Sequence, residues 1–170
     1  MLRWSAQALG AWCAFTGPLH GGAPGPTLDL LDAVAAVDDV DGWIERRLAA
    51  GERLMGFGHR VFRGNDPRAE AMRVALRRMG LAAGRLAFAE HVERRVAAVL
   101  ARVKPGRSPP ANVEIAAALL LDAVGIPREA LTTVFAVSRC AGCLAHAMEQ
   151  QKAGRMIRPT SRYVGTPTVD

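Results

Sequence analysis

Apolar residues recur at the spacing of an α-helix along almost the whole chain. The clearest case is residues 86–103 (LAFAEHVERRVAAVLARV), with apolar residues at positions 86, 88, 92, 96, 99, 100 and 103. Residues 113–125 (VEIAAALLLDAVG) are apolar nearly all round, which predicts a buried helix. Because no segment alternates apolar and polar residues as a half-buried strand does, the sequence predicts an all-α fold.

Capping residues mark where these helices begin and end. Thr27 is placed to cap a helix over 27–37, and Asp66 to cap a helix with Pro67 at its first position. Gly80 marks the end of that second helix. Further helices are predicted over 4–15, from Asp41 or a neighbour to residue 50, and from Pro127 toward Gln151, with an irregular tail over 155–170.

The size and charge of the chain exclude several classes of function. With 170 residues, 50% of them hydrophobic, it can bury the core of one domain or of one and a half. Its net charge of +6 suits acidic partners, but aromatic residues are only 5% and no dense basic block occurs, so nucleic-acid binding is not expected. No apolar run approaches the ~20 residues of a membrane span, and we therefore predict no membrane segment.

The three cysteines offer no disulfide framework, which favours the reducing cytoplasm. Cys140 and Cys143 have the spacing of a redox motif or of half a zinc site. No second pair completes such a site. We interpret these cysteines as small core residues and predict no metal site.

Three loops carry residues that suit proton transfer. His20 lies in GPLHGGAPGP (17–26), His59 in GFGHRVFRGNDPR (56–68), and Glu114 ends PPANVE. A lone loop histidine is usually a surface residue, and the helix dipole alone explains a glutamate in a first helical turn. Glycines beside both histidines, however, let the backbone approach a ligand closely. Two histidines and a carboxylate can together abstract a proton beside a carbonyl and hold the resulting enolate.

Five motifs in order extend this interpretation. They are GPLHGGA, GFGHRV followed by DPR, the PxNVE loop, FAVSRCAGxxAHxxEQ and RMIRPxSRYVG. Together they resemble the C-terminal part of citrate synthase, an enzyme of the tricarboxylic acid cycle, and its 2-methylcitrate synthase relatives. The resemblance extends over essentially all 170 residues. It implies an all-α citrate synthase-like fold, with a small CoA-binding domain over 24–122 and large-domain pieces over 1–23 and 123–170.

The resemblance also implies roles for the residues of the three loops. His20 matches the histidine that donates a hydrogen bond to the thioester carbonyl of the acyl-CoA. His59 matches the histidine that polarises the oxaloacetate carbonyl. Glu114 stands where the catalytic base of the family is usually Asp. The extra methylene moves the carboxylate by about 1 Å, a displacement that can cost ~100-fold in rate unless the loop adjusts.

Several arginines match residues that bind the acidic groups of the substrates. Planar guanidinium groups suit carboxylates and phosphates. By resemblance, the carboxylates of oxaloacetate and citrate are bound by Arg68, Arg139 and Arg158, and the last of these reaches the partner subunit's site in dimeric members. Arg63 falls where an arginine approaches the CoA phosphate, and Arg107 assists from its loop.

The chain departs from the family in length. Family members have a long N-terminal half that includes a further oxaloacetate-binding histidine, and this chain starts a few residues before GPLHGGA. The helices over 4–15 and 128–151 would pack against that half. Their apolar faces then need a partner, either in a homodimer or from a companion chain.

Three functions remain open at this point. The first is acyl transfer from acetyl-CoA or propionyl-CoA to oxaloacetate, with CoA as co-substrate and no tightly bound cofactor. The second is a non-catalytic paralogue that binds CoA or pairs with a full-length synthase. The third is citryl-CoA lyase chemistry on the same fold. The sequence leaves the choice of acyl group open.

Overall fold

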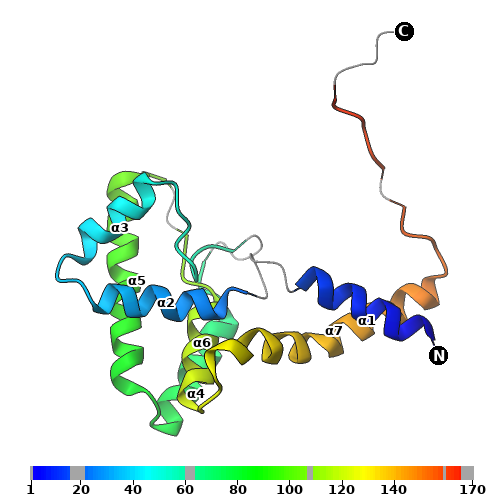
Figure 1. Cartoon of the computed structure of the whole chain (residues 1–170), viewed down its shortest axis with the longest axis horizontal. Coiled ribbons are helices and arrows are strands. Elements are labelled where there is room, and N and C mark those ends of the chain that lie inside the picture. The colour runs from blue at the N-terminus through cyan, green and yellow to red at the C-terminus, as the bar shows by residue number, and fades with distance from the viewer. Residues whose placement is uncertain (1, 16–21, 60–63, 107–108, 159, 166–170) are drawn as a thin grey trace.

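The chain folds into helices that separate into a bundle and a projecting pair (Figure 1). The computed structural model describes residues 2–15, 22–59, 64–106, 109–158 and 160–165, with the backbone alone for residues 2–5 and 7. The bundle contains α2 (Pro24–Ala35), α3 (Val40–Ala49), α4 (Pro67–Met79), α5 (Ala83–Val103) and α6 (Val113–Ala123). The pair is α1 (Leu2–Phe15) and α7 (Leu131–Ala153), and a short 3-10 helix, η1 (Arg128–Ala130), precedes α7.

The all-α prediction is confirmed. Apart from helices, the described residues contain one isolated bridge, between Phe57 and Ala111. The hydrophobic core draws on every helix of the bundle. Its largest fully buried members are Leu28, Leu31 and Val34 of α2, Ile44 of α3, Leu76 of α4, Val92, Val96 and Val99 of α5, Ile115 and Leu119 of α6, and Leu131 of α7.

The two strongest helix predictions match the structure closely. Residues 115–119 of α6 are all buried, as expected for a helix that is apolar on every side. In α5, five of the seven predicted apolar positions are buried, at 86, 92, 96, 99 and 100. Phe88 packs against the core while partly exposed, and Val103 is exposed at the helix end.

The predicted starts of α2 and α4 had different outcomes. Asp66 caps α4 as predicted, and Gly80 ends it with a positive φ of 64°. The Thr27 prediction is wrong, since α2 begins at Pro24 and Thr27 lies buried inside it. There the Thr27 hydroxyl donates to the Ala23 carbonyl at 2.8 Å. Proline suits the first helical turn because its fixed φ is already helical, and this signal prevails over the threonine.

The projecting pair has the exposed apolar surface that the sequence predicted. Helices α1 and α7 lie side by side and contact each other (Figure 1). On α7, Val137 is 62% exposed and Met148 is 60% exposed, and Leu9 of α1 is 62% exposed. Arg128 of η1 ties this pair to the bundle through ion pairs with two carboxylates of α2, Asp29 at 2.5 Å and Asp32 at 2.7 Å.

One helical segment bears on the prediction that the chain has no membrane span. Residues Arg128–Ala153 form a segment long and apolar enough, by length and composition, to cross a membrane, and 11% of its apolar window is buried. A long core helix of a larger assembly meets the same test. Arg139, in the middle of this segment, would cost about 2.5–3.5 kcal/mol at a bilayer centre. We therefore interpret α7 as a helix that packs against protein.

Candidate active site

Two loops pair through their backbones and bring distant residues together. Gly58 donates its N–H to the Pro110 carbonyl at 2.8 Å, and Asn112 donates its N–H to the Gly56 carbonyl at 2.9 Å. The bridge between Phe57 and Ala111 lies between these bonds. His59 comes directly after residues 56–58, and Glu114 comes shortly after residues 110–112. The pairing of these two loop segments therefore fixes the separation of two predicted site residues.

Gly56 makes this close approach possible. Its φ of +86° lies in the left-handed region, which disfavours any residue with a side chain. A Cβ on residue 56 would lie 2.5 Å from Cγ1 of Ile115 and 3.2 Å from Cγ2 of Thr27. The backbone of the loop therefore packs directly on α6 and α2, where only glycine fits.

Asn112 connects the loop to the helix that carries Glu114. Its Oδ1 accepts the backbone N–H of Glu114 at 2.9 Å, which caps α6. Its Nδ2 donates to the Gly58 carbonyl at 2.8 Å. One side chain therefore positions both the start of α6 and the residue before His59. We did not single it out from the sequence, although it lies inside the PxNVE motif.

Asp66, Arg68 and His59 form a chain of polar contacts. The Asp66 residue is only 3% exposed. Its Oδ1 accepts from Nε of Arg68 at 3.0 Å and its Oδ2 from a terminal nitrogen at 2.8 Å, a two-pronged ion pair. The same Arg68 nitrogen lies 3.2 Å from Nε2 of His59. The hydrogen bonds from Arg68 are the main reason that the pKa of Asp66 lies below its usual range.

Burial and nearby charges both act on the carboxyl group of Glu114. Its Oε2 is buried, with no hydrogen-bond partner among the described residues. Burial raises the pKa of Glu114 from its ordinary value of 4.5 to about 7, although the nearby Arg68 charge lowers it and the Asp66 charge raises it further. Near neutral pH, Glu114 therefore exists in both forms, as a group that exchanges protons in catalysis should.

This raised pKa predicts how stability depends on pH. Between pH 4.5 and about 7, the folded chain keeps a proton on Glu114 that the unfolded chain has lost. Stability from this group is thus present at low pH and is lost as the pH rises through about 7. Urea unfolding from pH 4.5 to 8 should show wild type losing free energy of unfolding relative to Glu114→Gln, which cannot titrate. Parallel curves would mean that the pKa of Glu114 is not raised.

The structure assembles three of the eight predicted site residues. His59, Arg68 and Glu114 lie together around Asp66 and Asn112. Arg139 lies on α7 against α1, and Arg158 is exposed beyond the end of α7. His20, Arg63 and Arg107 lie outside the described residues.

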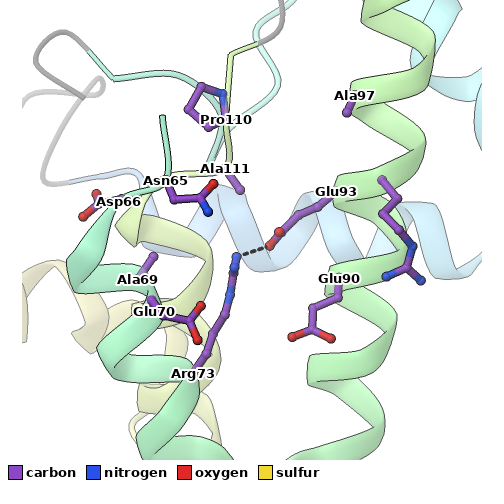
Figure 2. Close-up of a pocket in the computed structure, with 11 residues that line it drawn as sticks. Asn65, Asp66, Ala69, Glu70, Arg73, Glu90, Glu93, Ala97, Pro110 and Ala111 are labelled. Carbon is purple, nitrogen blue, oxygen red and sulfur yellow. Dashed lines mark hydrogen bonds and ion pairs between the residues drawn. The ribbon is translucent and has the colours of Figure 1, made fainter. Parts of the chain in front are cut away.

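A groove of about 360 Å³ lies beside Asp66, between α4 and α5 (Figure 2). The ion pair between Arg73 and Glu93, at 2.6 Å, spans it. Burial raises the pKa of Glu93, and the Arg73 charge opposes this rise. Asp66 and Asn65 line the end nearest the site. The charges of Arg73 and Glu93 therefore neutralise each other across this groove.

The cysteines are less buried than predicted. Cys13 and Cys140 are exposed and Cys143 is partly buried, so the expectation of core thiols is wrong for the first two. Cys140 and Cys143 line a cavity of about 70 Å³ between α1 and α7. No group of three or more metal-binding side chains occurs in the described part of the chain.

Comparison with known proteins shows what this arrangement resembles. The family described as citrate synthase, C-terminal domain, matches residues 5–160. A relative from Mycobacterium tuberculosis is 42% identical over 161 residues, which cover 95% of this chain and 43% of the relative. The chain therefore spans less than half the length of this curated relative.

Solved structures show the same similarity. The crystal structure of citrate synthase from Thermotoga maritima matches with a TM-score of 0.77 and 31% identity, over 92% of this chain and 42% of that one. Citrate synthase from Thermoplasma acidophilum, solved as a ternary complex with carboxymethyl coenzyme A and oxaloacetate, matches with a TM-score of 0.75 and 27% identity. That match covers 93% of this chain and 42% of the other.

Proposed function

The chain belongs to the citrate synthase family, and we propose that it contributes the C-terminal part of an acyltransferase active site. The reaction condenses acetyl-CoA or propionyl-CoA with oxaloacetate, giving citrate or 2-methylcitrate and CoA. The observation that supports this most is Glu114, a carboxyl group with a pKa of about 7 beside Arg68, which is within hydrogen-bond distance of His59.

The proposed reaction assigns one role to each of these residues. Glu114 removes a proton from the α-carbon of the thioester, and the electron pair forms an enolate. That carbon then attacks the ketone carbon of oxaloacetate, whose oxygen takes a proton from His59. Arg68 holds a substrate carboxylate by its planar fork. Water then cleaves the thioester and releases CoA as a thiol.

The enolate needs a donor that Glu114 cannot provide. One well-placed donor in a dry site contributes roughly 3–4 kcal/mol to such a transition state. We assign this role to His20 by its position in GPLHGGA. Arg139 and Arg158 are proposed to bind carboxylates, and Arg63 and Arg107 to approach CoA.

The proposal includes the rest of the fold, because the chain matches 43% of its relative. We place it on the exposed apolar surface of α1 and α7, as part of a longer chain, within a homodimer or from a companion chain. We propose residues 24–122 as the CoA-binding domain and 1–23 with 123–170 as parts of the large domain. The proposed compartment is the cytoplasm.

A thiol-release assay tests the activity. The full chain is incubated with acetyl-CoA or propionyl-CoA and oxaloacetate, alone and with the N-terminal part of the Thermotoga maritima citrate synthase. We expect CoA release that requires both substrates and is lost in His59→Ala. The absence of release at saturating protein in both arrangements would reject catalysis.

Two companion measurements separate the alternative functions. Calorimetry that detects CoA binding without turnover would indicate the non-catalytic paralogue, which Glu114 in the place of the usual Asp favours. Product analysis starting from citryl-CoA distinguishes synthesis from lyase chemistry, because a lyase yields acetyl-CoA and oxaloacetate whereas hydrolysis yields citrate and CoA.

A further inference from the structure

Asp66 does more than cap a helix. Its Oδ1 accepts the backbone N–H of Arg68 at 3.0 Å, and this single bond is enough to cap α4. The same carboxylate also accepts two side-chain hydrogen bonds from Arg68. The backbone N–H of Val113, the first residue of α6, stabilises its charged form as well. One buried carboxylate therefore connects the starts of the two helices that carry Arg68 and Glu114.

The comparison with Asp39 shows that these extra contacts are specific to Asp66. Asp39 caps α3 by accepting the backbone N–H of Gly42 at 2.9 Å, at an exposed site. Asp66 is 3% exposed, and its side chain is 1% exposed. Keeping a carboxylate charged at such a site is costly unless it is paired, and Arg68 provides the pairing.

Arg68 is in turn held between His59 and Glu114. A guanidinium group only donates hydrogen bonds, so Nε2 of His59 accepts in the contact of 3.2 Å with Arg68. The charge of Arg68 also acts on Glu114. The Arg68 side chain is 50% exposed, and its two-pronged bond to Asp66 restrains its position.

We propose that Asp66 is a positioning residue, which holds the Arg68 guanidinium group at a fixed place beside His59 through two side-chain hydrogen bonds. This inference rests on the proposed function for its substrate measurements. Asp66 itself has no role in contacting the substrate.

Asp66→Asn separates positioning from capping. Asparagine caps helices as well as aspartate does, so α4 keeps its start. The variant loses the negative charge and presents an N–H₂ group to a guanidinium that can only donate. Its effect falls on Arg68, because the guanidinium group loses the carboxylate that accepts two of its side-chain hydrogen bonds.

The test follows the Nε–H group of Arg68 by NMR in the full chain and measures oxaloacetate binding by calorimetry. We expect this N–H, which Asp66 accepts in wild type, to lose its protection from exchange with water in Asp66→Asn. Oxaloacetate binding should weaken about tenfold, because a displaced charge-assisted hydrogen-bond donor costs about that much. Asp66→Ser, a second capping residue whose hydroxyl carries no charge, should lose the same protection.

The matched control is Asp39→Asn, which makes the same substitution at the cap of α3. It should leave both the protection of the Arg68 Nε–H and oxaloacetate binding unchanged. Unchanged protection in folded Asp66→Asn and Asp66→Ser would overturn the positioning role. The exchange measurement needs no substrate, so wild-type protein that fails to bind oxaloacetate or release CoA would reject the proposed function separately.

Discussion

Replacing Glu114 by glutamine is expected to lower CoA release by about 10²–10⁴-fold, the contribution of a well-placed general base. Glutamine keeps the size and the hydrogen-bonding capacity of the side chain but cannot accept the α-proton of the thioester. The Asn112 side chain still caps α6 by accepting the backbone N–H of residue 114, so the fold should remain. The measurement is the initial rate of thiol release at saturating acetyl-CoA and oxaloacetate, in the arrangement in which the wild-type chain is active.

The pH profile gives an independent check of the same role. Only the carboxylate form of Glu114 accepts a proton, and its pKa is about 7. Wild-type kcat/KM should therefore rise with pH through about 7. Glu114→Asp keeps a carboxylate and is displaced by about 1 Å, so it should stay within ~100-fold of wild type. If Glu114→Gln were as active as Glu114→Asp, Glu114 would not be the base.

Replacing Gly56 by alanine is expected to destabilise the fold by about 2–5 kcal/mol. The left-handed backbone accounts for about 1–2 kcal/mol and overpacking for about 1–3 kcal/mol. The new Cβ would lie 2.5 Å from Cγ1 of Ile115, a buried core side chain that has little room to move. Urea unfolding followed by circular dichroism measures the loss, which is large against the ~5–15 kcal/mol of a typical domain.

Gly51→Ala is the matched control for this variant. Gly51 also has a positive φ, of +73°, but a Cβ there meets nothing within 4 Å. It should show the backbone cost alone, about 1–2 kcal/mol. Equal losses in the two variants would mean that contact with Ile115 contributes nothing and that residue 56 tolerates a side chain.

The sequence predicted the helices well because the signals were local. Periodicity located α5 and α6, and Asp66 with Pro67 located the start of α4. The start of α2 was wrongly assigned to Thr27 because threonine and proline both mark helix starts. The prolines at 24 and 26 place the start of α2 earlier. Cys140 was misjudged because burial depends on what packs against α7, and periodicity within α7 does not show this.

The sequence identified individual candidate residues of the site but not the contacts that join them. Motif order identified His59, Arg68 and Glu114. The contacts of Asn112 with Gly58, and of Asp66 with the start of α6, depend on how two loops pair after folding. The capping rules predicted that Asp66 starts α4, but they did not predict its contact with the start of α6. The roles assigned to all eight site residues stay predictions.

The pairing of the two loops also orders the events of folding. Asn112 and Gly58 are 54 residues apart in sequence, so their hydrogen bond closes a long stretch of chain. Closing a loop of that length has an entropic cost that must be met before the contact gives any stabilisation. The intervening α4 and α5 form by local contacts and shorten the distance between the loop ends. Helical content is therefore expected to form before the two loops pair during refolding.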